Sequence, residues 1–180
     1  MDLLETLRQR NSDFSETGFT AGMKMMPSLK TLIVGCLDPR VDPMDILQLK
    51  PGEAAIVRNV GGRVGPAFFE TVGMLRALSR SRGNELGPGW NVVVLHHTDC
   101  GINGCVHEAP DLVAHYMGVQ EQDLERLSIT DPYRSVEVDV AALRARDDFP
   151  ASATVTGMVY DVATGRVEVV VPPSQARSEK

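Results

Sequence analysis

Three residues with metal-binding side chains stand in two short clusters. Cys36 opens the first cluster, and His97 and Cys100 belong to the second. Cysteine sulfur and histidine nitrogen are ligands that zinc prefers, in a tetrahedral arrangement. The spacing of His97 and Cys100 allows both side chains to reach one ion across a tight turn. Three protein ligands would leave the fourth position open for water, so the pattern predicts a catalytic zinc site with one ion per chain.

A carboxylate and a guanidinium lie beside the first of these ligands. Asp38 and Arg40 are separated by Pro39, which favours an extended conformation for the residue before it. In an extended segment the two side chains project to the same side and can pair. Such a pair taken alone is a surface ion pair of little energetic weight. Its position beside Cys36 makes Asp38 and Arg40 candidate active-site residues.

The other histidines and the third cysteine have plainer explanations. His96 adjoins His97, but successive side chains of a strand point to opposite faces, so we expect His96 to pack or bond within the fold. Cys105 is expected in a helix; as a fourth ligand it would close the site and make it structural. His107 and His115 are expected on the surface, with His107 kept as a candidate for proton transfer.

The candidate ligands follow segments that have the pattern of buried strands. Residues 31–35 and 92–96 are short and almost continuously apolar, which is typical of parallel strands buried on both faces. Ligands of open parallel sheets bind beyond the carboxyl ends of the strands, where Cys36 and His97 fall. We therefore expect an α/β fold with a mostly parallel central sheet flanked by helices and with an antiparallel strand at its C-terminal end.

The remaining segments alternate between helical and strand patterns within a single domain spanning residues 1–180. Residues 1–28 are expected to form an N-terminal helical arm, and residues 172–180 a loose tail. The other expected elements are helices over residues 43–49, 66–82 and 136–146, one helix running from Cys100 to Met117, a strand over residues 54–58, and a hairpin of residues 154–161 and 166–171.

Composition excludes several classes of protein. The net charge of −6 argues against nucleic acid or an anionic membrane as a partner. No segment has the roughly 18 continuous apolar residues that a membrane helix requires. The first residues lack the apolar core of a signal peptide, so a cytoplasmic location is the expectation. Three cysteines cannot all pair within one chain, which argues against a disulfide framework.

These motifs together resemble the β-class carbonic anhydrases. The residues that carry the resemblance are C-x-D-x-R-V at 36–41 and H-x-x-C-G at 97–101. The sequence R-N-V-G-G at 58–62 is similar to a loop of that family, and residues 155–165 are similar to its C-terminal strand pair. The resemblance spans roughly residues 30 to 171 in matching order.

The resemblance implies a β-carbonic anhydrase-like fold and the reversible hydration of CO2 to bicarbonate by zinc-bound hydroxide. It also implies a homodimer or homotetramer. The site residues that it implies are Cys36, His97 and Cys100 as zinc ligands, Asp38 and Arg40 as an active-site pair, Asp38 as an alternative fourth ligand in a closed form, and Asn59, Gly61, Gly62 and Gly101 in the substrate pocket.

One departure from the family and two alternatives remain open. The residue between Asp38 and Arg40 is usually small in the family, whereas Pro39 lacks a backbone N–H and has a fixed φ. The first alternative is hydrolysis of carbonyl sulfide or carbon disulfide, for which the same zinc motif would serve. The second alternative is a non-catalytic zinc domain, for which Cys105 would supply the fourth ligand.

Overall fold

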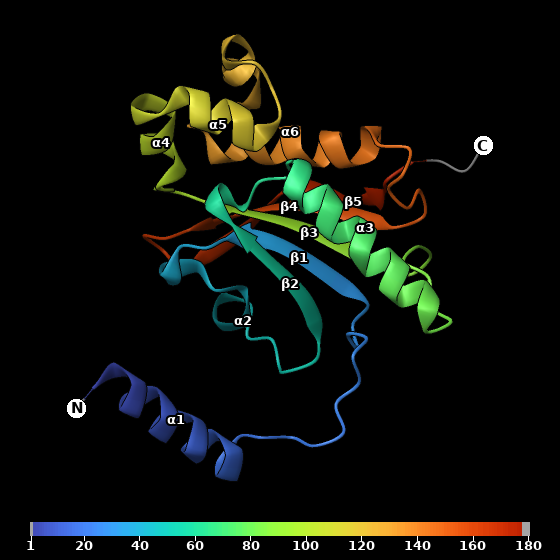
Figure 1. Ribbon diagram of the computed structural model, residues 1–180. Coiled ribbons are helices and arrows are strands. Elements are labelled where there is room, and N and C mark those ends of the chain that lie inside the picture. Colours follow the sequence, from blue (N-terminus) through green and yellow to red (C-terminus); the bar gives the residue numbers. More distant parts are fainter. Residues whose placement is uncertain (1, 178–180) are drawn as a thin grey trace.

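A five-stranded sheet with helices on both faces organises the chain, and the computed structural model describes it for residues 2–177 (Figure 1). The strand order is β2-β1-β3-β4-β5, with all neighbours parallel except the last pair. This arrangement confirms the predicted α/β class and its antiparallel C-terminal strand. The strands are β1 (Thr31–Cys36), β2 (Ala54–Asn59), β3 (Asn91–His97), β4 (Thr154–Asp161) and β5 (Arg166–Gln175).

Parallel pairing brings the candidate ligands to one edge of the sheet. β1 pairs with β3 so that Gly35 lies beside Leu95, and both strands then end within two residues. Cys36 is the last residue of β1, and His97 is the last residue of β3. The apolar runs before them are buried because both strands lie inside the sheet and both of its faces are covered.

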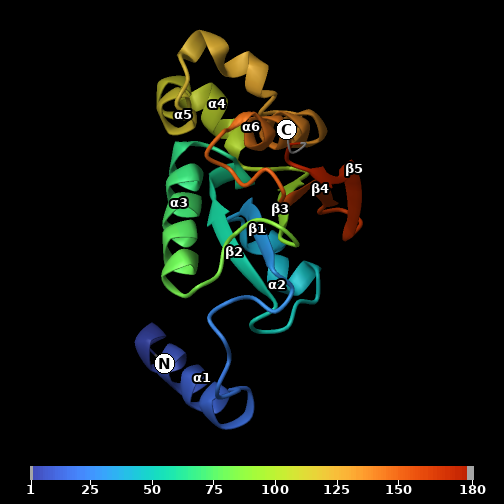
Figure 2. The same ribbon diagram turned by 90° about the vertical axis from the view of Figure 1, so that its right-hand side faces the viewer.

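The helices form two layers and a cap. α3 and α6 cover one face of the sheet, and the short α2 lies on the other face, where Pro43 packs against Gly35 (Figures 1 and 2). α4 and α5 lie beyond the strand ends and pack with the turn Glu121–Leu127 in a second apolar cluster. The helices are α1 (Leu3–Thr17), α2 (Pro43–Ile46), α3 (Pro66–Ser81), α4 (Ile102–Glu108), α5 (Pro110–Met117) and α6 (Pro132–Ala145).

The predicted single helix from Cys100 to Met117 is wrong, because the segment contains two helices. α4 ends at Glu108 and α5 begins at Pro110. Ala109 between them has φ −149° and ψ 62°, outside the helical region. A proline disfavours the helical conformation in the residue before it, which accounts for the break.

The predicted tail from residue 172 is also wrong for the residues that the structure describes. β5 continues to Gln175, which pairs with Thr154 of β4, and Ala176 beyond it is buried. Pro172 and Pro173 are tolerated because β5 is an edge strand and its register with β4 shifts between Val155 and Gly157, opposite the two prolines. Residues 178–180 lie outside the described part of the chain.

Two predicted helices have different bounds in the structure. α2 ends at Ile46 rather than at residue 49, and Gln48 just beyond it has a φ of 52°. α6 begins at Pro132, four residues earlier than expected, because the Asp131 side chain caps it by accepting hydrogen bonds from the N–H groups of Tyr133 and Arg134.

The predicted N-terminal helix is present as α1 and contacts little of the body. None of its residues is buried, and it stands apart from the sheet at the end of the segment 18–30 (Figures 1 and 2). Among residues 2–177, no helix has both the length and the apolar character needed to cross a bilayer.

Candidate metal centre

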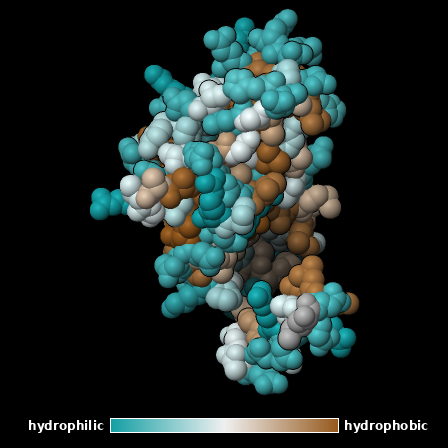
Figure 3. All heavy atoms as spheres, turned by 90° about the vertical axis from the view of Figure 1, so that its left-hand side faces the viewer, coloured by the Kyte–Doolittle hydropathy of each residue, from teal (hydrophilic) through white to brown (hydrophobic). Residues whose placement is uncertain are grey.

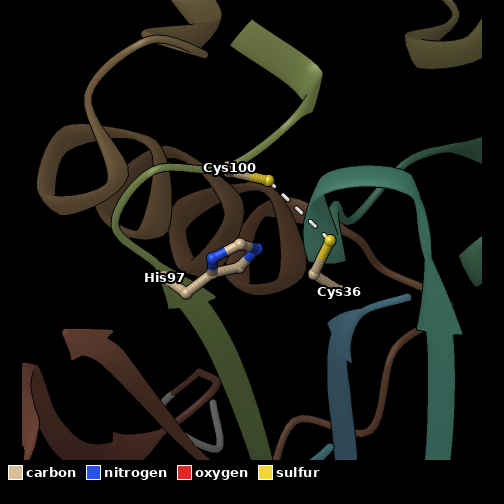
Figure 4. A group of neighbouring side chains, drawn as sticks. All are labelled: Cys36, His97 and Cys100. Carbon is tan, nitrogen blue, oxygen red and sulfur yellow. Dashed lines mark hydrogen bonds between the residues drawn. The ribbon is translucent and has the colours of Figure 1, made fainter. Parts of the chain in front are cut away.

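The structure brings the three predicted ligands together at the end of the sheet. Cys36 and His97 come from the ends of β1 and β3, and Cys100 lies in the turn before α4. Their side chains point toward one another, as Figure 4 shows. The ligand atoms all lie within 4.8 Å of one another, and the two sulfurs are 3.7 Å apart.

The donor set fits a tetrahedral zinc ion. His97 Nδ1 lies 2.8 Å from the carbonyl oxygen of Thr98, to which it donates as an N–H, so that Nε2 carries a free lone pair. That Nε2 atom is buried and has no hydrogen-bond partner. Sulfur ligands at about 2.3 Å from zinc would be separated by about 3.8 Å in a tetrahedron, which is close to the 3.7 Å observed. The exposed Cys105 lies outside this group.

The electrostatics of the cluster favour a thiolate. The neighbouring Cys100 thiol lowers the pKa of Cys36 to about 4; burial opposes this shift, and His97 and the N–H groups of Asp38 and Gly61 add to it. The Cys36 thiolate and burial in turn raise the pKa of Cys100. Burial lowers the pKa of His97, but the Cys36 thiolate, the Thr98 carbonyl and the charge of Asp38 together outweigh it, so that the net pKa is raised. The sulfurs thus share negative charge that a bound cation would neutralise.

Glycines of the loop after β2 form the backbone support of Cys36. Gly62 has a φ of +65°, and a Cβ placed on it would lie 3.0 Å from the backbone nitrogen of Cys36. Gly61 has a φ of +75°, and its Cβ would lie 2.6 Å from Ile102 Cδ1. Glycine is required at both positions, because φ is positive and a Cβ would collide with the backbone beside Gly62 or with the Ile102 side chain beside Gly61.

The predicted pocket residues therefore lie beside the metal centre, but one of them is already bonded. The Asn59 side chain accepts a hydrogen bond from the Arg63 N–H and donates one to the Arg63 carbonyl, both at 2.8 Å. The Asn59 side chain therefore stabilises the loop that contains Gly61 and Gly62. Gly101 precedes α4 and has open space around the position of a Cβ.

Asp38 and Arg40 form the predicted pair. Arg40 Nη2 donates to Asp38 Oδ2 at 2.7 Å, and Nε donates to Oδ1 at 3.1 Å. The hydrogen bonds and charge of Arg40 lower the pKa of Asp38 to about 2. The Asp38 carboxylate is not among the group of ligand atoms around Cys36. The structure thus has the arrangement in which Asp38 is held by Arg40.

The backbone of this pair is a turn rather than the predicted extended segment. Asp38 has a φ of −53° and a ψ of 125°, Pro39–Val41 form a short 3-10 helix, and Asp38 Oδ1 accepts a hydrogen bond from the Arg40 N–H at 2.9 Å. Pro39 occupies the first position of this turn, where its fixed φ is suitable and its missing N–H leaves no bond unmade. The proline is therefore compatible with the pair.

Sequence reasoning missed two residues that hold the pair in place. Asp99 accepts from Arg40 Nη1 at 2.8 Å through its carboxylate, and its carbonyl accepts from Nη2 at 3.0 Å. Arg58 donates to the carbonyl oxygens of Asp38 and Cys36, at 2.7 and 2.9 Å. Both residues lie within the quoted motifs, but only the fold shows that they meet residues 36–40.

The remaining predictions for single residues are confirmed as to location. His96 is buried and bonds within the fold, with Nδ1 at 2.7 Å from Ser135 Oγ. Cys105 lies in α4 and is exposed. His107 and His115 are exposed, and proton transfer by His107 stays a prediction.

Comparison with known proteins agrees with this geometry. The family model described as carbonic anhydrase matches residues 31–128. Beta-carbonic anhydrase 1 of Mycobacterium tuberculosis is 26% identical over 96% of this chain and 100% of its own length. A carbonic anhydrase structure from Streptococcus mutans is 31% identical, with a TM-score of 0.72 over 94% of this chain and 98% of that one. A carbon disulfide hydrolase structure, 23% identical with a TM-score of 0.58 over 92% and 88% of the two chains, shares the fold.

Proposed function

The chain belongs to the β-class carbonic anhydrase family, and we propose that Cys36, His97 and Cys100 hold one zinc ion at which CO2 is reversibly hydrated to bicarbonate. The observation that carries the proposal is the group of three ligand atoms within 4.8 Å, one of them the unpaired Nε2 of His97. Two thiolates match the charge of Zn²⁺, and three ligands leave a position for water.

The chain's own residues would orient the reaction. Zinc, when bound, lowers the pKa of water so that hydroxide is available near neutral pH. Asp38 is ionised at that pH, so it can accept a hydrogen bond from a reacting O–H group but cannot donate one. Arg40 binds the Asp38 carboxylate through two nitrogens and so keeps it from serving as a fourth ligand.

The structure argues against one of the two alternative functions but does not distinguish the other from CO2 hydration. A non-catalytic zinc domain would require a closed site, and the Cys105 sulfur lies outside the ligand group. Hydrolysis of carbonyl sulfide or carbon disulfide would use the same donor set. The likeness to a carbon disulfide hydrolase concerns the fold alone, so substrate choice requires an assay.

We expect the zinc-loaded protein to hydrate CO2 with a higher kcat/KM than it shows for carbonyl sulfide or carbon disulfide. Stopped-flow measurement of proton release with CO2, beside sulfide release from the other two substrates, tests this preference on one preparation. Faster hydrolysis of either sulfur compound would reassign the substrate. Inertness toward all three substrates at full zinc occupancy would remove the catalytic proposal.

We also infer that the chain functions as a homodimer or larger assembly. α1 exposes one apolar side chain after another: Leu3 is 71% exposed and Leu4 62%. Figure 3 shows further apolar residues gathered along one side of the body, beside the hollow that separates it from the arm. A monomer rarely leaves so much contiguous apolar surface in water, and a second copy of the chain would cover it.

Sedimentation should find the parent protein as a dimer or tetramer of the 19.6 kDa chain. Replacing Leu3, Leu4 and Leu7 together by serine should shift it toward monomer, because these apolar side chains are exposed in the described chain. Arg8→Ser on the same helix is the matched control and should leave the assembly unchanged. A parent that sediments as a fully active monomer contradicts the inference.

A further inference from the structure

A buried polar cluster next to the metal centre has no part in the chemistry described so far. Its members are 1–2% exposed, and they link α6 to the loop after β2 and to the end of β3. They are Arg63, His96, Ser135 and Asp139.

Asp139 of α6 is the centre of this cluster. Its Oδ1 accepts a hydrogen bond from Arg63 Nη2 at 2.8 Å, and its Oδ2 accepts one from the backbone N–H of Val64 at 2.9 Å. His96 Nε2 lies 3.2 Å from the same Oδ2. One carboxylate therefore contacts groups from two separate segments of the chain.

The carboxylate is ionised although it is buried. Burial raises the pKa of Asp139, but the contact with His96, the charge of Arg63 and the Val64 N–H together outweigh it, so the pKa stays below its usual value. A buried charge pair depends on both partners, because removing one of them leaves the other uncompensated. Removing either Asp139 or Arg63 alone should therefore destabilise the link between α6 and the loop after β2.

Both segments bound by Asp139 adjoin metal ligands. Arg63 directly follows Gly62, whose backbone packs against the Cys36 nitrogen. His96 directly precedes His97, and its other ring nitrogen lies 2.7 Å from Ser135 Oγ on α6. A displacement of α6 would therefore be transmitted to the support of one ligand and to the strand end that carries another.

We propose that Asp139 is a positioning residue for the metal centre, because it is hydrogen-bonded to Arg63 and lies against His96, and so holds the supports of Cys36 and His97 at a fixed distance. The inference rests on the metal centre proposed above. Metal affinity then depends on the Asp139 carboxylate of α6, which contacts none of the three ligands. Groups outside the ligand sphere commonly change metal affinity about 10–100-fold.

The test separates positioning from stability. Asp139→Asn leaves a buried guanidinium without its anion and should melt at a lower temperature. The informative variant is therefore Arg63→Met with Asp139→Leu, which removes both charges and fills the space. It leaves the Val64 N–H without its acceptor, so its Tm should fall, but by less than that of Asp139→Asn. Leu143→Ala is the control, because Leu143 is fully buried in α6 within the apolar core and its truncation destabilises without removing any hydrogen bond of the cluster.

The measurements are the dissociation constant for Co²⁺ and the visible absorption spectrum of the Co²⁺-loaded proteins. We expect the double variant to bind Co²⁺ about 10–100-fold more weakly with altered absorption bands, and Leu143→Ala to match the parent. Parental affinity and spectrum in the folded double variant would overturn the proposal, as would an equal loss in Leu143→Ala. A parent that does not bind Co²⁺ would instead refute the metal centre itself.

Discussion

Replacing Cys36 or Cys100 by serine should remove the metal and, with it, CO2 hydration. Each sulfur is one of three ligands, and a hydroxyl is a far weaker ligand for zinc than a thiolate. Loss of an outer-sphere partner already weakens metal binding by about 10–100-fold, so loss of a direct ligand should exceed that range. Elemental analysis should find far less than one zinc per chain, and the hydration rate should fall to background.

Cys105→Ser is the matched control for both cysteine variants. Its sulfur is exposed and outside the ligand group, so zinc content and activity should equal those of the parent. A Cys36→Ser, Cys100→Ser double variant that still retains one zinc per chain would refute the assignment. Loss of zinc from Cys105→Ser would point to the closed site of a non-catalytic zinc domain.

Arg40→Ala should lower the CO2 hydration rate by about 100-fold, the upper range for a partner outside the ligand sphere, while zinc content stays near that of the parent. Without Arg40, the Asp38 carboxylate loses its bidentate partner and can compete for the fourth position on the ion. Arg40→Lys should recover only part of the activity, because an ammonium cannot replace the planar fork of guanidinium nitrogens. Zinc analysis beside stopped-flow rates for both variants measures the effect.

The loss in Arg40→Ala does not come from protonation of Asp38. Arg40 lowers the pKa of Asp38 to about 2, and without Arg40 the pKa would rise toward its ordinary value near 3.8. Because the pKa of Asp38 is lower in the folded protein, its ionised form stabilises the fold at any pH above the ordinary carboxyl pKa. This stabilisation disappears as the pH falls from about 4 toward 2. Asp38 is ionised at assay pH in both proteins.

Asp99→Asn is the control for the second partner of Arg40. The substitution removes the negative charge of the Asp99 side chain but keeps the Asp99 carbonyl contact and the whole Asp38 pair. Its side chain is largely exposed, so the effect on rate should be small. Near-parental activity in Arg40→Ala would contradict a role in the reaction and show that the Asp38–Arg40 pair is only a surface salt bridge.

Sequence reasoning located the metal ligands because parallel sheets bury both faces of their inner strands. The apolar runs before Cys36 and His97 are typical of inner strands, and the ends of parallel neighbours meet at one edge. His97 and Cys100 are only three residues apart, so the local turn before α4 is enough to bring their side chains together. Placing Cys36 beside His97 depended in addition on β1 being the neighbour of β3, which the structure shows.

The errors arose where the structure depends on local turn chemistry or on contacts distant in sequence. The break at Ala109 follows from Pro110, a signal that the helical spacing concealed. The turn at Asp38 depends on its own side chain accepting the Arg40 N–H. The Arg40–Asp99 contact and the link from Asp139 to Arg63 join residues that only the fold brings together.

X-ray absorption at the zinc edge of the parent protein tests the central claim most directly. With Cys36, His97 and Cys100 as ligands, the ion should show two sulfurs at about 2.3 Å and one nitrogen at about 2.0–2.1 Å, with an oxygen in the fourth position. Its occupancy should be one zinc per chain. A shell of three or four sulfurs, a zinc without sulfur ligands, or a folded protein without zinc would contradict the account.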